Sequence, residues 1–236
     1  LAAAGLMLVS TGAYLWLPRL ARLPRTERSI GMLLGGINYV RSNSIVLGAI
    51  ALDLFIVLAG SVMALLPVYA SDILHVGPDA LGMLRGAPAL GGVIVGFAMA
   101  ALPPIRRSGL CLFLALFVFS ASIAVFAFST IFWVSLLALC VYGAADMVSV
   151  NVRMPLIQLA TPDPLRGRVS AVNAIFISSS NEIGDVRSGS VAAILGPVPT
   201  VFIGSLMAFG VALSGWCLFP KLRQLDRLTD ARPPTN

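Results

Sequence analysis

Residues 110–128 read LCLFLALFVFSASIAVFAF, a run without a single charged side chain. A helix needs roughly 20 apolar residues to cross the hydrocarbon of a bilayer, so this run is long enough to span one. The whole chain has the same character, because 58% of its 236 residues are hydrophobic and only 11% are charged. Soluble domains carry about 25% charged residues, since their surface has to meet water. The sequence therefore predicts an integral membrane protein.

Six further segments resemble this run in length and composition. The predicted spans cover 1–17, 45–68, 80–102, 110–128, 131–151, 169–194 and 199–219. Proline and glycine stand in most of the connections, where helices end. We predict an all-α integral membrane protein with seven transmembrane helices. Gly82 with Gly86, and Gly92 with Gly96, have the spacing that lets another helix approach the third span closely.

The basic residues gather in alternate connections. Those after the first, third, fifth and seventh spans hold Arg19, Arg22, Arg25, Arg28, Arg41, Arg106, Arg107, Arg153, Arg166, Arg168, Lys221, Arg223, Arg227 and Arg232. The positive-inside rule assigns such connections to the cytoplasm. This predicts a multi-pass protein of the cell membrane with a cytoplasmic tail at 220–236. The arginines lie in short connections without an aromatic platform, so the net charge of +6 does not indicate nucleic-acid binding.

The longest polar stretch, 18–44, separates the first span from the other six. Its apolar residues recur at helical spacing, at Ile30, Leu33, Leu34, Ile37 and Val40. The spacing predicts a short amphipathic helix on the cytoplasmic face of the membrane. The chain begins at Leu1, already inside an apolar run that lacks the basic start of a signal peptide. We therefore expect a truncated N-terminus.

The sixth predicted span carries a polar stripe. Three- and four-residue steps connect Ser178, Asn181, Glu182, Asp185 and Ser188, and Asn173 extends the stripe toward the cytoplasm. A helix in lipid has a reason for such a stripe only if the stripe faces an aqueous path or a polar seam with another helix; we favour the path. Two carboxyls as close as Glu182 and Asp185 repel each other when both are ionised, which favours proton binding.

Four other ionisable residues lie inside predicted spans, where a charge costs at least a few kcal/mol. Asp53 is either a proton or substrate site or a buried carboxylate satisfied by a neighbouring Ser or Arg. Asp146 lies seven residues before Arg153, on the same helix face. It is either a proton site or part of a structural charge cluster, and in an exporter the two residues would form a cytoplasmic gating pair. Arg85 and Arg187 fall outside the basic connections, and structural pairing is the preferred interpretation for both.

The chain lacks the residues that several classes of membrane enzyme and cofactor-binding protein need. The chain has one histidine, His75, and it lies in a connection, so neither a helical metalloprotease site nor a nucleophile with its base can form in the membrane. Cys111, Cys140 and Cys217 each sit in an apolar run and lack the spacing of a zinc site. The single lysine, Lys221, lies outside the spans, which excludes a retinal Schiff base. We expect no enzyme, no metal and no cofactor.

Several stretches resemble the enterobactin-exporter-like branch of the major facilitator superfamily. They are YVRSN at 39–43, AIALDLF at 49–55, LPVYASDIL at 66–74, GAADMVSV at 143–150, ATPDPLRGRVSAVN at 160–173, SNEIG at 180–184, LGPVP at 195–199 and LFPKLR at 218–223. The resemblance implies the last seven helices of a twelve-helix fold. Residues 1–17 would end the N-terminal half, 18–44 would be the linker, and 45–219 would form the six-helix C-terminal half.

The resemblance also implies which residues are functional and what the protein does. Asp53, Arg85, Asp146, Asn181 and Glu182 stand at family-typical positions, whereas Arg187 reverses the charge often found there. The family implies proton-driven export of drugs or siderophores by alternating access, as an antiporter, with the missing N-terminal half and the lipid bilayer as partners. The proton or substrate path would then hold Ser178, Asn181, Glu182, Asp185 and Asp53. The alternative is a truncated or non-transporting membrane scaffold or partner subunit.

Overall fold

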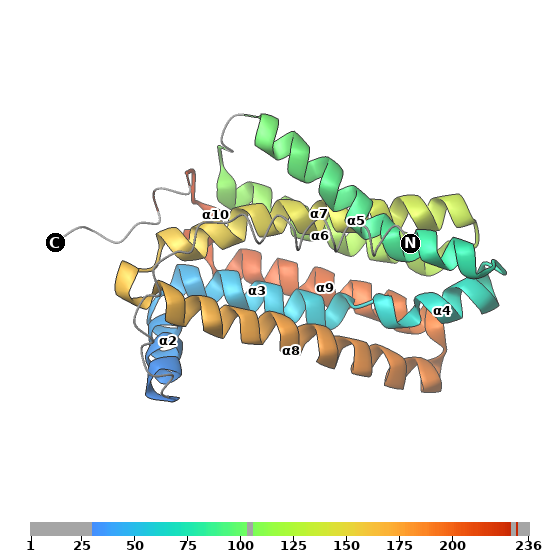
Figure 1. The fold of residues 1–236 in the computed structure, drawn as a ribbon, viewed down its shortest axis with the longest axis horizontal. Coiled ribbons are helices and arrows are strands. Elements are labelled where there is room, and N and C mark those ends of the chain that lie inside the picture. Colours follow the sequence, from blue (N-terminus) through green and yellow to red (C-terminus); the bar gives the residue numbers. More distant parts are fainter. Residues whose placement is uncertain (1–29, 103–105, 228–229, 231–236) are drawn as a thin grey trace, which may run out of the picture. The chain divides into compact units, whose positions relative to one another are not determined.

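The computed structural model describes residues 30–102, 106–227 and 230, and these form helices without any strand (Figure 1). The main helices are α2 (Ile30–Ser42), α3 (Ser44–Gly60), α5 (Pro78–Ala101), α6 (Ser108–Phe128), α7 (Phe132–Leu159), α8 (Asp163–Leu195) and α9 (Pro197–Leu218), followed by the short α10 (Pro220–Arg223). The all-α prediction is confirmed for this part of the chain. The predicted first span, 1–17, lies outside the described residues.

Within the described ranges, five helical segments are long and apolar enough to cross a membrane. They are Ser44–Ile73, Pro78–Ala101, Ser108–Phe128, Phe132–Leu159 and Pro197–Leu218. The predicted span 169–194 is helical, as part of the 33-residue α8. At 1.5 Å per residue α8 is about 50 Å long, which exceeds the hydrocarbon thickness. Its polar and charged side chains keep it below the apolarity of the other five, so the count of seven spans is not confirmed.

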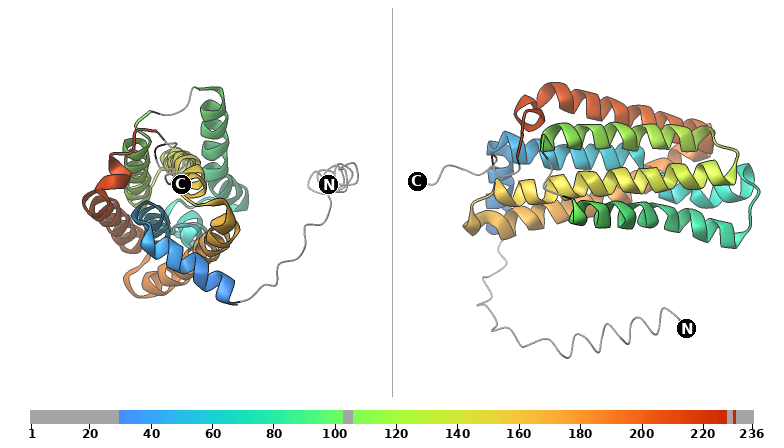
Figure 2. Two further views of the ribbon diagram at one scale, coloured as in Figure 1. Left: turned by 90° about the vertical axis from the view of Figure 1, so that its left-hand side faces the viewer. Right: turned by 90° about the horizontal axis from the view of Figure 1, so that it is seen from above.

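The helices pack as one bundle whose contacts follow a simple plan. α3 lies against α8 and α9, α6 lies against α7 and α9, and α5 lies against α7. The two further views in Figure 2 show α3, α6, α7, α8 and α9 running along a common direction. Their buried side chains form one continuous apolar core, which Phe113 and Phe119 of α6 and Leu156 of α7 anchor in full burial.

The span that begins with α3 is discontinuous. α3 ends at Gly60, and Ser61 and Val62 are not helical. The chain then resumes as a 3₁₀ turn at Met63–Leu65, a short α4 at Leu66–Val68 and a π turn at Tyr69–Ile73. The sequence predicted an uninterrupted helix over 45–68. A helix that ends inside the membrane leaves backbone carbonyls without an intrahelical partner, and these need donors from elsewhere.

The second part of the predicted linker, from Ile30 on, is a helix, and its apolar face contacts the protein. Val40 of α2 is buried in the core, and Ile37 packs against the same core. The Tyr39 hydroxyl donates a hydrogen bond to the Ala160 carbonyl after α7. The Asn43 side chain then caps α3 by accepting from the backbone N–H groups of Ile45 and Val46. α2 is therefore tied to the end of the bundle where α3 and α8 begin.

α5 and α7 approach each other closely at two glycines. A Cβ atom added at Gly91 would lie 1.9 Å from the Cys140 carbonyl oxygen, and one at Gly143 would lie 2.0 Å from the Pro88 carbonyl oxygen. By contrast, a Cβ at Gly82 or Gly86 would meet nothing within 4 Å. Within the described part of the chain, Gly82 and Gly86 therefore mark no close contact, contrary to the prediction. Glycine spacing shows where contact is possible, and the rotation of the helix decides which glycine is used.

Gly143→Ala is expected to destabilise the protein, because the new methyl group would push α7 away from α5. Overpacking of this kind costs about 1–3 kcal/mol. Thermal unfolding of the purified protein in detergent measures the loss. Gly210→Ala on α9 is the matched control, since a Cβ there meets nothing within 4 Å. Equal melting temperatures for the two variants would contradict the close contact.

Candidate functional site

A buried ion pair joins two of the membrane-length helices. A carboxylate oxygen of Asp53 on α3 contacts the Nη1 atom of Arg153 on α7, and the two side chains are 5% and 4% exposed. Arg153 Nη1 also lies 3.4 Å from the Ser149 hydroxyl on its own helix. The Arg153 Nε atom is buried without a hydrogen-bond partner in the described structure. Each charge is removed from water, so each depends on the other for its stability.

The sequence left two interpretations open for Asp53. The structure gives its buried carboxylate an arginine as partner, and its role as a proton or substrate site stays a prediction. The expected pairing of Asp146 with Arg153 is not seen: the ion pairs of the described residues are Asp53–Arg153 and the surface pair Asp163–Arg166. Asp146 lies half-buried on α7. Positions seven apart share a face of one helix, but Arg153 turns toward the neighbouring α3.

Asn173 of α8 is a buried polar side chain that contacts α7. It is 4% exposed, and its amide nitrogen lies 3.5 Å from the sulfur of Met154, the residue after Arg153. Its side-chain oxygen has no hydrogen-bond partner among the described atoms. A buried amide oxygen without a donor is costly. α8 thus places a buried polar side chain at its contact with α7.

A second polar cluster fills the interruption after α3. Arg187 Nη2 of α8 donates to the Ala59 carbonyl oxygen at 2.7 Å, and the Ser188 hydroxyl donates to the Ser61 carbonyl oxygen at 2.8 Å. The Ser61 hydroxyl donates in turn to the Asp185 carboxylate. α8 therefore supplies the donors that the interrupted helix lacks.

Small residues allow this cluster to close. A Cβ at Gly184 of α8 would lie 3.1 Å from the Ser61 side chain, and one at Gly204 of α9 would lie 2.7 Å from the Ala59 carbonyl oxygen. The Arg187 guanidinium consequently sits between α3 and α9, with Nη1 3.8 Å from the sulfur of Met207. The sequence suggested structural pairing for Arg187. The structure instead gives it a backbone carbonyl.

Sequence reasoning did not identify Ala59 or Ser61 as part of a site. The carbonyl groups carry no sequence signal of their own. Gly60 and Ser61, both weak helix formers, stand a few residues before Pro67, which cannot donate a backbone hydrogen bond. That combination within an apolar span is the signal that would have indicated an interruption.

The polar stripe of α8 divides into two parts. Asp185 and Ser188 turn toward the interrupted helix, as a polar seam would. Ser178, Asn181 and Glu182 lie on the exposed surface of the described bundle. Asn181 donates to the Ile177 carbonyl of its own helix at 3.0 Å. The seam interpretation thus describes Asp185 and Ser188. For Ser178, Asn181 and Glu182, the aqueous path stays a prediction. Arg85 is likewise exposed, on α5.

Replacing Arg187 tests the contact with the helix interruption. Arg187→Met is expected to lower the free energy of unfolding by about 1–3 kcal/mol, because the Ala59 carbonyl loses its donor. Arg187→Lys keeps a donor and should lose less. Thermal unfolding in detergent and amide hydrogen exchange across 59–65 are the measurements. Arg85→Met, at an exposed position, should change stability by no more than about 0.5 kcal/mol; an equal effect at both arginines would refute the contact.

The fold and the buried polar contacts define a multi-pass helical membrane protein. The family model described as "transmembrane secretion effector", MFS_3, matches residues 7–235. The chain belongs to this family, within the major facilitator superfamily. The sequence motifs indicated a resemblance to an enterobactin-exporter-like C-terminal half. This match confirms it.

The chain is similar to proteins named enterobactin exporter EntS. It is 25% identical over 234 residues to the protein of Citrobacter koseri, and 26% identical over the same length to those of Escherichia coli O81 and Shigella boydii serotype 18. Each match covers 99% of this chain and 55% of the relative. The chain therefore spans about half the length of the curated relatives it matches. No solved structure matches it significantly.

Proposed function

We propose that this chain is part of a secondary active exporter that exchanges protons for small amphipathic molecules, such as siderophores or drugs, by alternating access. Membership of the secretion effector family and the names of the relatives support export. Because the chain spans about half the length of those relatives, the proposal concerns the chain together with an N-terminal half. That half would form the opposite wall of the transport path.

The proposed arrangement follows the domains expected from the sequence. Residues 1–17 would be the last helix of the N-terminal half, 18–44 the linker, and 45–219 the six-helix C-terminal half. The basic connections and the tail at 220–236 would lie in the cytoplasm, in accordance with the positive-inside rule. The protein would reside in the cell membrane and would act as a transporter without a cofactor.

The observation that carries proton coupling is the buried pair of Asp53 and Arg153. Binding of a proton to Asp53 would remove its charge and leave Arg153 buried without a counter-ion. A buried charge that loses its partner costs about 3–5 kcal/mol. Proton binding would thereby favour a different arrangement of α3 against α7, which is the coupling that alternating access requires. Arg153 would be the gating residue, with Asp146 and Arg85 as further members of the charge network.

The polar stripe of α8 supplies the remaining assignments. Ser178, Asn181 and Glu182 are exposed on the described bundle and would line the path for substrate and protons. Asp185 would belong to the same path, although its contact is with Ser61. Arg187 would hold the interrupted helix in place. An interruption of this kind leaves a span able to bend, as discontinuous helices do in other transporters.

Everted membrane vesicles that contain the full-length transporter test the proposal. Uptake of enterobactin, the molecule in the relatives' names, is measured after an acid-inside pH gradient is imposed. We expect uptake that follows the gradient and ends when a protonophore collapses it. A cationic dye serves as a second probe for drug export. Uptake of either probe that persists without the gradient would contradict proton exchange.

A further inference from the structure

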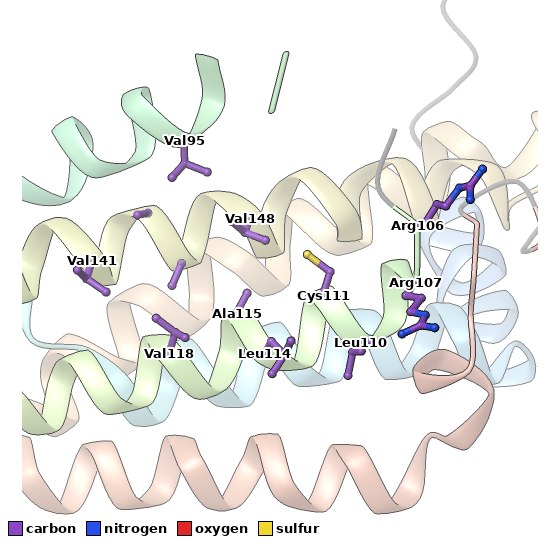
Figure 3. A pocket seen from close by; sticks show the side chains of 12 residues that line it. Val95, Arg106, Arg107, Leu110, Cys111, Leu114, Ala115, Val118, Val141 and Val148 are labelled. Carbon is purple, nitrogen blue, oxygen red and sulfur yellow. The ribbon is translucent and has the colours of Figure 1, made fainter. Parts of the chain in front are cut away.

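An apolar groove with a volume of about 490 Å³ lies between α5, α6 and α7, toward the end where α6 begins. Figure 3 shows Val95 of α5 on one side, Leu114 and Val118 of α6 on the other, and Val148 of α7 between them. The groove is open to the exterior of the bundle. Its described lining residues include no carboxylate and are apolar apart from one end and Cys111.

The groove exists because α5 diverges from its neighbours. α5 touches α7 at Gly91 and Gly143 and then leans away from the bundle toward its C-terminal end (Figure 1). Beyond that crossing, Phe97 is 76% exposed. The α7 side of the opening is lined by the small side chains of Ala144 and Ala145. Helix angle and small residues thus leave a space that no described side chain fills.

The length of the groove corresponds to one leaflet of a bilayer. Its lining on α6 runs from the residue before the helix, Arg107, to Val118, a difference of 118 − 107 = 11 positions. With 1.5 Å per residue this is about 16 Å. Half of the hydrocarbon thickness is about 15 Å. With Arg107 at the level of the headgroups, the groove would reach about the middle of the membrane.

Two arginines supply the polar end of the groove. Arg106 and Arg107 line it, and both are exposed (Figure 3). Neither guanidinium takes part in an ion pair among the described residues. Asp226 is the acidic side chain that contacts this corner, and it accepts from the backbone N–H of Arg107 at 3.2 Å.

The first two backbone N–H groups of α6 already have hydrogen-bond acceptors within the protein. Ser108 N–H donates to the Asp226 carbonyl at 3.1 Å, and Gly109 N–H donates to the Leu225 carbonyl at 3.0 Å. The segment after α10 therefore closes the helix N-terminus. The positive charge at the mouth of the groove comes from the two guanidinium groups, whose planar donors suit a phosphate.

We propose that this groove binds an anionic phospholipid. Its phosphate would lie on Arg106 and Arg107, and one acyl chain would follow the groove between α5 and α6. The arginine pair follows a predicted span on the side that the positive-inside rule assigns to the cytoplasm, so the lipid comes from that leaflet. The inference does not depend on transport, because it rests on the groove and its charges alone.

Native mass spectrometry of the full-length transporter tests this inference. The protein is purified in detergent and incubated with phosphatidylglycerol or with phosphatidylcholine, and bound lipid is counted. We expect clear preference for phosphatidylglycerol. The double variant Arg106→Gln with Arg107→Gln should bind it roughly 30-fold more weakly, since each basic residue near an anionic surface contributes roughly a fivefold factor. Ala144→Phe, which fills the groove, should reduce binding of both lipids.

The control is the double variant Arg41→Gln with Arg227→Gln, which removes two exposed charges outside the groove. It should bind phosphatidylglycerol as the original protein does. Equal losses in the two double variants would overturn the site, as would undiminished binding in Arg106→Gln with Arg107→Gln. Excess inorganic phosphate should leave the lipid bound, because the acyl chain contributes to binding. Displacement by phosphate alone would indicate a free-anion site and contradict the proposal.

Discussion

Asp53→Asn is expected to destabilise the protein by about 3–5 kcal/mol and to abolish proton-driven export, because it leaves Arg153 buried without its counter-ion. The two side chains are 5% and 4% exposed, so water cannot replace the lost carboxylate. Thermal unfolding in detergent measures the first effect, and vesicle uptake under a pH gradient measures the second. Asp163→Asn is the matched control, since Asp163 pairs with Arg166 at the surface, where its side chain is 83% exposed. Exposed pairs contribute up to about 1 kcal/mol.

The double variant Asp53→Asn with Arg153→Gln separates structure from coupling. It removes both charges, so no uncompensated ion remains in the core, and we expect most of the lost stability to return. Export should stay absent, because no carboxyl remains to bind the proton. A double variant that regains both stability and proton-driven export would show that Asp53 is not the proton site. A single variant as stable as the original protein would show that the pair is not buried as described.

Glu182→Gln is expected to reduce proton-driven export to background while the protein still inserts and folds. Glu182 is exposed on α8 and has no hydrogen-bond or ion-pair partner within the described residues, so its neutral analogue should change stability by no more than about 0.5 kcal/mol. The amide cannot bind and release a proton at this position. Vesicle uptake under an imposed pH gradient is the measurement, with melting temperature as the check on folding.

Asp79→Asn is the control for Glu182, because Asp79 is an exposed carboxylate in the first turn of α5, outside the polar stripe. It should export at the original rate. Unchanged export by Glu182→Gln would refute its assignment to the path. Loss of export by both variants would show that export also depends on an exposed carboxylate outside the polar stripe. That result would likewise contradict a specific role for Glu182.

Much of the fold could be predicted from the order of residues. The helices over 80–102, 110–128 and 199–219 appear within a few residues of α5, α6 and α9. Lipid imposes one rule on each segment separately: its side chains must be apolar over about 20 residues, and its ends are marked by proline, glycine or charge. The family was likewise readable, since the motifs that carry it are continuous in the chain. Asp53, Asp185 and Arg187 were identified as residues of interest for the same reason, as charges within apolar runs.

What each of those charges contacts was decided by the tertiary structure. Periodicity places side chains on a face of their own helix, and for that reason Asp146 was expected beside Arg153. The rotation and depth of a helix against its neighbours decide which partner that face meets, and they bring Asp53 to Arg153 and the Ala59 carbonyl to Arg187. These contacts join residues that are 100 and 128 positions apart. Helix packing, which depends on many side chains at once, determines them, whereas the hydrophobicity of each segment by itself determined that the chain lies in a membrane.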